Sequence, residues 1–170
     1  GLVAFGEGPE SPLPPRPGRP GLVGVLLALQ DDAGGGAAAT LRDALRTVGA
    51  AARQRSLVAI VSDFRGPLDW SRTLLDLAGR HDVLAVEVRD QREQELPDIG
   101  EIWLTDPETG DRLRVDTRDE RLRARFAQAA AAERAAVADA LIRAGAVHVV
   151  LDTDTDWLRL LAASLQRRRR

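Results

Sequence analysis

Carboxylates that directly follow apolar runs are the residues of this chain best placed to do chemistry. Asp63 comes after Ser62 and the apolar run Leu57–Val61. A short run with β-branched members and no polar alternation is typical of a strand that is buried on both faces. In open α/β sheets, ligands bind outside the carboxyl ends of the strands. The position of Asp63 therefore predicts a binding site at that edge of a sheet.

A second group of carboxylates, Asp152–Asp156, follows the apolar run Val147–Leu151. Three Asp residues at alternate positions can supply the oxygens that a hard cation such as calcium requires. An EF-hand loop also needs a Gly and a distal Glu in register, and both are missing here. The pattern favours a cluster that caps a final helix beginning at Trp157, because Asp suits both the cap and the helix dipole.

The two histidines are predicted to have structural roles. His81 precedes a predicted strand at Val83–Val88, which puts it at the opposite edge of the sheet from Asp63, so a role as ligand or base is disfavoured. His148 lies inside the predicted strand Val147–Leu151, where we expect a packed side chain. The chain has no Cys, which excludes disulfides, thiolate metal sites and a thiol nucleophile.

Apolar periodicity predicts strands and helices in α/β order, with Thr40 as the N-cap of one helix and Gly145 ending another. A β-hairpin is predicted around a turn at 107–110. The predicted strands are 2–5, 57–61, 83–88 and 147–151, with hairpin strands 101–105 and 112–115; the helices are 22–30, 40–55, a region after Pro67, 119–145 and one beginning at Trp157.

Helical spacing also predicts which apolar side chains face the core. We expect burial of the following residues: Leu41, Ala44, Leu45 and Val48; Trp70, Leu74, Leu75 and Leu77; Leu122, Phe126, Ala129, Ala130, Val137 and Leu141; and Trp157, Leu158, Leu161 and Leu165. The Gly-rich stretch 31–39 is predicted to be a loop without the spacing of a phosphate cradle. The Pro-rich stretch 7–20 contains a PxxP spacing, but an edge strand or loop is favoured over an SH3-type ligand.

Composition limits the class of protein. The chain has 170 residues, of which 44% are hydrophobic and 29% charged, with a net charge of -2, which is typical of one globular domain. Acidic residues are interspersed among the Arg residues, so nucleic-acid binding is not expected. There is no signal peptide and no apolar run near 18 residues in length. Together with the absence of Cys, this predicts a cytoplasmic protein without a membrane span.

The chain resembles the bacterial family called domain of unknown function fifty-eight in four segments, which follow the family's order and spacing: VSDFRG at 61–66, LAGRHDVLAVEVRDQREQELPDIG at 77–100, LTDPETGDRLRVDT at 104–117 and VHVVLDTDTDW at 147–157. That family is similar to von Willebrand factor A domains and is typically linked to MoxR-type AAA+ ATPases. The resemblance implies a three-layer Rossmann-like domain over residues 1–170, with a mostly parallel sheet and a hairpin insert.

The resemblance also implies a metal-ion-dependent adhesion site built from three loops. Asp63 matches the Asp of the third loop, and the Thr of the second loop falls near Thr40. Aligning the helix instead puts Ala39 at that position and leaves Thr40 as a helix cap. The Asp-x-Ser-x-Ser sequence of the first loop does not occur in these residues. Bound Mg²⁺ is therefore implied only if that loop lies upstream, and no other cofactor is implied.

The segment Leu2–Phe5 is similar to the second strand of that family. The resemblance thus places the central first strand upstream of Gly1, and the chain, which has no Met, is expected to be a fragment or a processed product. A domain without its central strand is expected to be poorly stable, to re-pair its strands, or to receive the strand from another polypeptide.

Two functions remain open at this stage. The favoured one is a non-catalytic interaction module, an adaptor whose partner is a MoxR-like AAA+ ATPase. The alternative is a metal-dependent phosphoesterase-type hydrolase that uses Asp63 and the Asp152–Asp156 loop. We favour the adaptor because the sequence has no nucleophile elbow, P-loop or dinucleotide fingerprint.

Overall fold

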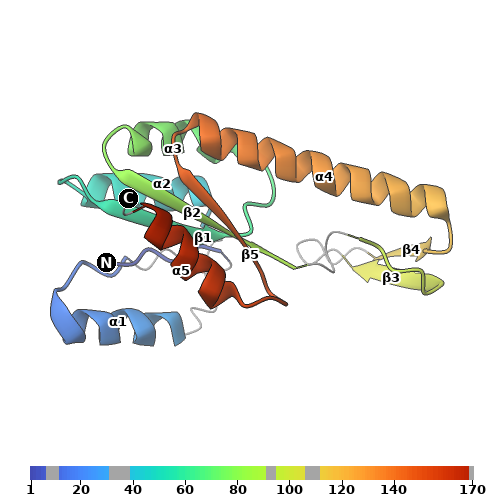
Figure 1. The fold of residues 1–170 in the computed structure, drawn as a ribbon, viewed down its shortest axis with the longest axis horizontal. Helices are drawn as coiled ribbons and strands as arrows, with labels where there is room; N and C mark the ends of the chain where they lie inside the picture. Colours follow the sequence, from blue (N-terminus) through green and yellow to red (C-terminus); the bar gives the residue numbers. More distant parts are fainter. Residues whose placement is uncertain (7–11, 31–38, 91–94, 106–111, 169–170) are drawn as a thin grey trace. The chain divides into compact units, whose positions relative to one another are not determined.

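The computed structural model describes residues 1–6, 12–30, 39–90, 95–105 and 112–168 (Figure 1). Its main sheet contains three parallel strands in the order β1-β2-β5. These strands are β1 (Leu57–Ser62), β2 (Asp82–Arg89) and β5 (Val147–Asp152). A separate antiparallel pair is formed by β3 (Glu101–Thr105) and β4 (Arg112–Asp116). The predicted α/β class with a parallel sheet and a hairpin is therefore confirmed at this level.

Five α-helices and one 3₁₀ helix are described: α1 (Gly18–Gln30), α2 (Leu41–Ala51), η1 (Leu68–Trp70), α3 (Ser71–Ala78), α4 (Glu120–Arg143) and α5 (Trp157–Arg168). The contacts of the chain divide it into two compact units. The first unit comprises 1–59, 66–84 and 141–147, and the second comprises 60–65, 85–140 and 148–170.

The core of the first unit is built where α2, η1 and α3 pack together. Ala44 and Leu45 of α2 are buried, as are Trp70 of η1 and Leu74 and Leu77 of α3. These residues recur at helical spacing, which is why the sequence predicts them correctly. The expectation fails for Leu75, which is 53% exposed. It lies between Leu74 and Leu77 in the helix, and its side chain points away from the face that these two residues bury.

Local signals at the helix ends agree with the structure. Gly145, at φ 76°, ends α4, and the Gly145 and Ala146 N–H groups donate to the carbonyls of Ile142 and Leu141 at 2.9 and 3.1 Å. This is a Schellman arrangement, which requires a left-handed residue and therefore suits Gly. Helix α1 begins at residue 18 rather than 22, because Pro20 is tolerated in the first turn of a helix.

The core of the second unit lies around the carboxyl-terminal parts of β1 and β2. The buried apolar residues of this unit are Ile60, Phe64, Ala85, Val86, Val137, Ala140, Val149 and Leu151. Val137 of α4 was predicted in the helix stripe, whereas Ala129 of the same predicted stripe is exposed. The second unit also contains both hairpin strands and α5.

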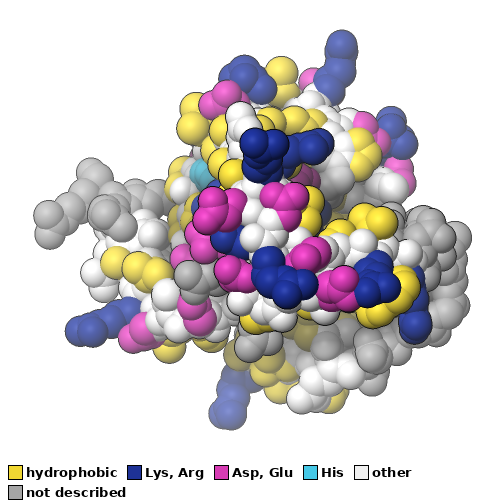
Figure 2. Space-filling view, turned by 90° about the vertical axis from the view of Figure 1, so that its right-hand side faces the viewer, with side chains coloured by type: hydrophobic (Ala, Val, Ile, Leu, Met, Phe, Trp, Pro, Cys, Tyr) yellow, Lys and Arg dark blue, Asp and Glu magenta, His cyan; other side chains and the backbone are white. Residues whose placement is uncertain are grey.

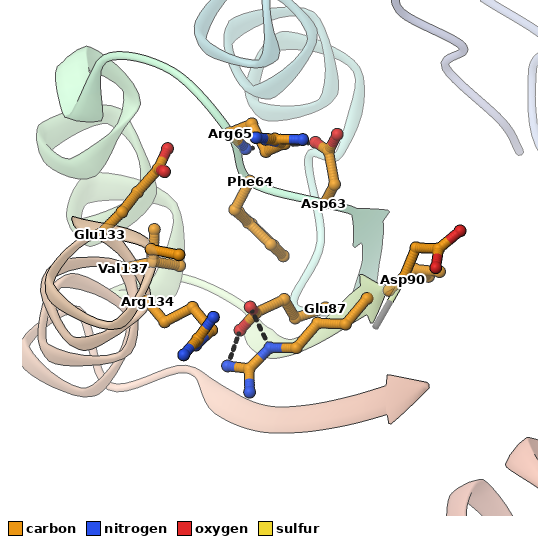
Figure 3. A pocket seen from close by; sticks show the side chains of 11 residues that line it. Asp63, Phe64, Arg65, Glu87, Asp90, Glu133, Arg134 and Val137 are labelled. Atoms are coloured by element: carbon orange, nitrogen blue, oxygen red, sulfur yellow. Dashed lines mark hydrogen bonds and ion pairs between the residues drawn. The ribbon is translucent and has the colours of Figure 1, made fainter. Parts of the chain in front are cut away.

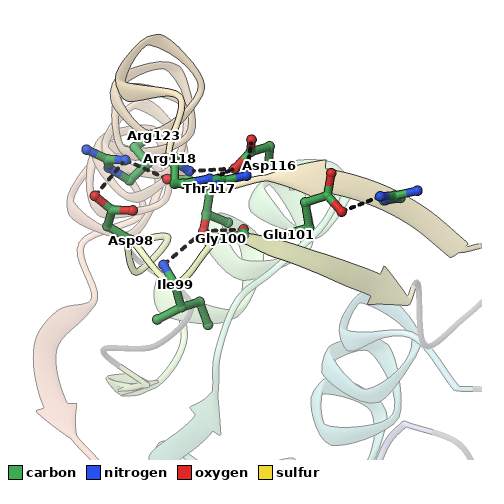
Figure 4. Close-up of polar contacts among 9 residues, drawn as sticks. Asp98, Ile99, Gly100, Glu101, Asp116, Thr117, Arg118 and Arg123 are labelled. Atoms are coloured by element: carbon green, nitrogen blue, oxygen red, sulfur yellow. Dashed lines mark hydrogen bonds and ion pairs between the residues drawn. The ribbon is translucent and has the colours of Figure 1, made fainter.

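Thr117 ties the base of the β3–β4 hairpin together (Figure 4). Its buried hydroxyl donates to the Gly100 carbonyl at 2.7 Å and accepts from the Ile99 N–H at 3.1 Å. Arg123 of α4 donates to the Thr117 carbonyl at 2.5 Å and pairs with Asp98 at 3.5 Å. Since an isolated two-stranded hairpin is marginally stable in water, these contacts connect β3 and β4 to the first turn of α4.

An ion pair in the same region perturbs two titrating groups. Hydrogen bonds from the Arg118 guanidinium lower the pKa of Asp116 below its ordinary value, and Asp116 raises the pKa of Arg118 in return. Both side chains are exposed, so this pair contributes little to stability.

Two expectations about strands are wrong. In β1 the side chains alternate, with Val58 and Ile60 buried and Leu57 and Val61 58% and 61% exposed, so β1 is not buried on both faces. The segment Leu2–Phe5 is not a buried strand. Its Leu2 forms one isolated antiparallel bridge to Leu13, and the four apolar residues make no ladder in the described chain. Apolar composition shows that a strand can be buried, but the presence of covering residues depends on tertiary packing.

Two expectations about helices are also wrong. Helix α2 ends at Ala51 rather than at 55, with Ala52 in an extended conformation. In α5, Trp157 and Leu158 are 51% and 62% exposed rather than buried. Apolar side chains of α1, such as Leu22, are likewise exposed.

Some predictions lie outside the described residues. These are the loop at 31–38, the hairpin turn at 107–110 and the first part of the Pro-rich stretch at 7–11. The neighbouring Pro14–Pro17 segment is described and has no regular secondary structure, in agreement with the loop expectation.

Two further observations bear on binding partners. Among the described residues, no helix combines the length and the apolar character needed to cross a lipid bilayer. Figure 2 shows Arg side chains interspersed with Asp and Glu on the face that it draws. The described part of that face therefore has no extended patch of a single charge.

Candidate functional site

The loop after β1 holds Asp63 in a defined conformation. The Ser62 hydroxyl accepts a hydrogen bond from the Phe64 N–H at 3.0 Å, and Asp63 Oδ1 accepts one from the Arg65 N–H at 3.2 Å. Ser and Asp side chains commonly satisfy backbone donors two residues on, in place of a strand ladder. The strand thus ends at Ser62 because the side chains of Ser62 and Asp63 accept hydrogen bonds from backbone N–H groups that would otherwise pair with a neighbouring strand.

Phe64 is strained and buried at the same time. Its φ of 54° lies in the left-handed region, where a residue other than Gly costs of order 1–3 kcal/mol. Its ring is 1% exposed, and burial of a large apolar side chain is worth roughly 1.5–3 kcal/mol, which offsets that strain. The buried ring anchors the loop, so that Asp63 and Arg65 on either side remain exposed to solvent.

A buried charged cluster lies at the carboxyl end of β2. Glu87 and Arg89 share one face of the strand because side chains alternate with period two. Arg89 Nε donates to Glu87 Oε1 at 2.6 Å and Arg89 Nη2 donates to Glu87 Oε2 at 3.0 Å. His148 Nε2 of β5 lies 2.7 Å from Glu87 Oε2. The Glu87 side chain is 4% exposed, so this carboxylate is almost fully removed from water.

Both oxygens of the Glu87 carboxylate have polar partners. Arg89 donates to Oε1 and Oε2, and His148 Nε2 lies at hydrogen-bond distance from Oε2. A buried carboxylate is tolerated where charged partners and hydrogen bonds satisfy it, and Glu87 has both. No described residue hydrogen-bonds His148 Nδ1, and the side chain retains 12% exposure.

A small cavity of about 60 Å³ lies between the Asp63 loop, the end of β2 and α4, all within the second unit (Figure 3). Its polar lining combines acidic and basic side chains from these three elements. The lining residues are Asp63, Phe64, Arg65, Glu87, Val88, Arg89, Asp90, Ala130, Glu133, Arg134 and Val137. The cavity holds a few water molecules and is far smaller than the pockets that take nucleotides or drug-sized ligands.

Thr40, the other residue of the implied metal site, caps a helix. Its hydroxyl donates to Asp43 Oδ2 at 2.6 Å and accepts from the Asp43 N–H at 3.2 Å. The hydrogen bond from this hydroxyl is the main cause that lowers the pKa of Asp43 below its ordinary value. The predicted N-cap is therefore confirmed. Thr40 belongs to the first unit and Asp63 to the second, and a metal role for either residue stays a prediction.

The Asp152–Asp156 segment also serves as a cap. Asp156 Oδ1 accepts from the Arg159 N–H at 3.3 Å, and the Asp152 carbonyl accepts from the Thr155 N–H and hydroxyl at 3.3 and 3.0 Å. The cap was favoured over a calcium loop, and these bonds confirm it. Among the described residues, no group of three or more His, Cys, Asp or Glu side chains is arranged to hold a metal ion.

His81 is buried, in agreement with a structural role. The side chain is 5% exposed, and neither ring nitrogen has a hydrogen-bond partner in the described part of the chain. A buried polar group without a partner costs stability.

Sequence reasoning missed the Glu87–Arg89–His148 cluster and the role of Arg134 in the cavity. One signal was present, since Glu87 interrupts an otherwise apolar strand and Arg89 follows at the same face. The partner His148 lies 61 residues further along the chain, and no local pattern connects the two.

The fold and the site define an α/β protein with a polar cavity at the carboxyl ends of parallel strands. Residues 1–136 match the family described as protein of unknown function DUF58, and the chain belongs to that family. It is 48% identical over 132 residues to an uncharacterized protein of Mycobacterium avium, across 78% of this chain and 76% of the relative.

Two other mycobacterial relatives are considerably longer. The chain is 47% identical over 118 residues to uncharacterized proteins of Mycobacterium bovis and Mycobacterium tuberculosis. These matches cover 69% of this chain and only 37% of each relative. No solved structure matches the chain significantly.

Proposed function

We propose that this chain is a non-catalytic protein-interaction module that binds its partner through the exposed loop around Asp63. The loop Ser62–Arg65 carries the proposal. Its backbone is held in a strained conformation by a fully buried Phe64, and it presents an exposed acid and an exposed base side by side. Strain that is retained in a surface loop is characteristic of functional sites. The carboxyl edge of a parallel sheet is also the usual place for binding.

The finer part of the proposal comes from the resemblance to von Willebrand factor A domains. It assigns the partner as a MoxR-type AAA+ ATPase and Asp63 as the residue that contacts it, either directly or through Mg²⁺. Carboxylate oxygens and retained waters suit Mg²⁺. The family carries a description of unknown function, and the mycobacterial relatives are uncharacterized.

The test is a binding measurement by isothermal titration calorimetry between the purified chain and a purified MoxR-type ATPase from the same organism. Asp63→Ala is expected to weaken binding at least about tenfold, which corresponds to loss of one charge-assisted contact. Asp76→Ala is the matched control, because Asp76 is an exposed Asp on α3 that does not belong to the loop. Equal affinities for the wild type and Asp63→Ala, or no binding by the wild type, would refute the proposal.

A second measurement separates the adaptor from an enzyme. The chain is incubated with p-nitrophenyl phosphate in the presence of Mg²⁺ or Mn²⁺, and no turnover is expected. Metal-dependent hydrolysis that disappears in Asp63→Ala and persists in Asp76→Ala would replace the adaptor by a hydrolase.

A further inference from the structure

The cavity beside Asp63 is lined by a cation that is not paired with any described residue. Arg134 of α4 lines the cavity and is half-buried, and in Figure 3 its side chain points toward Glu87. No hydrogen bond or ion pair joins Arg134 to any described residue. A guanidinium carries five N–H donors and cannot be deprotonated in a protein. A half-buried guanidinium without a partner therefore favours an anionic ligand.

The other charges of the cavity floor are already matched. Glu87 accepts two hydrogen bonds from Arg89 and lies at hydrogen-bond distance from His148, so its negative charge is compensated. Arg89 uses only Nε and one Nη group in this contact, and three of its five N–H donors remain. The floor of the cavity thus offers Arg134 and the free donors of Arg89.

Besides Glu87, the cavity is lined by Asp63, Asp90 and Glu133, here called its acidic rim, of which Asp90 is half-buried. Asp63 and Glu133 are exposed, so water screens their charges, and Asp63 Oδ1 accepts the Arg65 N–H. In Figure 3 Glu133 points away from Glu87. This acidic rim disfavours a dianion such as phosphate more than it disfavours a single carboxylate.

We propose that this cavity binds the carboxylate of an acidic side chain from the protein partner, with Arg134 as the main ligand-binding residue and Arg89 as the second donor. The volume of about 60 Å³ accommodates one carboxylate group and is far below the volume that a nucleotide-sized anion needs. Arginine binds carboxylates through two parallel N–H···O bonds, which adds geometric selectivity. The inference rests on the proposed interaction function and names the chemistry that the partner must present.

The first experiment measures the cavity without any partner. Sodium acetate is titrated into the ¹⁵N-labelled chain at constant ionic strength, and the Arg Nε–Hε signals are followed by NMR. We expect a saturable shift of Arg134 at acetate concentrations up to the order of 100 mM, the range for one or two charge-assisted contacts. Phosphate and chloride at the same ionic strength are expected to give no saturable shift.

Variants make this titration decisive. In Arg134→Gln the shifts of the neighbouring Arg89 signal are expected to require at least about tenfold more acetate, whereas Arg125→Gln stays within about twofold of the wild type. Arg125 is an exposed Arg on the same helix without a described partner, so it controls for the lost charge. Circular dichroism verifies that each variant is folded. The proposal would be overturned by the absence of a saturable shift in the wild type or by an equal response to phosphate. It would also be overturned if Arg134→Gln required the same acetate concentration as the wild type.

The second experiment uses the purified MoxR-type ATPase. Arg134→Gln is expected to weaken its binding at least about tenfold, and Arg125→Gln is expected to leave it within about twofold. If the ATPase binds the wild type and Arg134→Gln equally, the carboxylate site is refuted while the interaction function stands. If the ATPase does not bind the wild type, the interaction function with this partner fails, and the acetate titration alone decides the chemistry of the cavity.

Discussion

Replacement of Glu87 by Ala is expected to destabilise the protein more than any surface substitution. The variant leaves the Arg89 charge, 23% exposed, and His148, 12% exposed, without the carboxylate that joins them at 2.6 to 3.0 Å. Removing one partner of a buried ion pair costs about 3–5 kcal/mol, because the remaining charge stays desolvated. For a chain of this size this lowers the melting temperature by roughly 6–20 °C.

The assay is urea unfolding followed by tryptophan fluorescence and far-UV circular dichroism. Glu87→Gln keeps the shape and one hydrogen-bond acceptor but loses the charge, so an intermediate loss of about 1.5–3 kcal/mol is expected. Glu133→Gln is the matched control, since Glu133 is exposed on α4, and it should change the unfolding free energy by no more than about 0.5 kcal/mol. A loss below about 1 kcal/mol in Glu87→Ala would refute the reasoning that this carboxylate is buried and paired.

A triple variant provides an independent check of the same argument. Replacing Glu87, Arg89 and His148 together by Leu removes every charge of the cluster and leaves none unpaired. Such replacements of buried ion pairs by apolar residues are often neutral or stabilising. We therefore expect the triple variant to be more stable than Glu87→Ala. A triple variant that is less stable than Glu87→Ala would show that packing, rather than an unpaired charge, dominates.

Three further predictions concern single residues. His81→Leu is expected to raise the free energy of unfolding by about 1 kcal/mol, because it removes a buried imidazole without a described partner; urea unfolding that shows a loss instead would contradict this. Thr40→Val is expected to cost about 1 kcal/mol and to raise the pKa of Asp43 toward its ordinary value, as measured by NMR titration. Since the folded pKa of Asp43 is lowered, its contribution to stability is present above the ordinary pKa and is lost as the pH falls through the lowered one. An unfolding free energy that falls equally with decreasing pH in Thr40→Val and in the wild type would count against the cap. Phe64→Ala is expected to cost less than the usual 3–5 kcal/mol for a buried Phe but still more than about 1 kcal/mol, because the loop that loses its anchor can relax and release part of the left-handed strain. Calorimetric melting that is unchanged from wild type would refute the anchoring role.

The sequence by itself determined most of the elements and several of their ends, although the predicted strand at 2–5 does not form. The parallel strands, the hairpin strands and the helices occur close to where apolar periodicity predicts them. Thr40 and Gly145 mark helix ends as predicted, because caps depend on hydrogen bonds and dihedral angles within a few residues. The position of Asp63 at the end of β1 was likewise readable, since it depends only on where the strand stops.

Tertiary structure decided which apolar faces are covered and which charges meet. Leu57 and Trp157 read as core residues but are exposed, because burial depends on elements that no local pattern specifies. Glu87 and His148 meet across 61 residues, and Arg134 reaches the cavity from a helix that the sequence marks only as amphipathic. Side-chain periodicity encodes the direction in which a residue points along its own element. Only the packing of elements distant in the chain determines what lies opposite, and that packing creates the cavity next to Asp63.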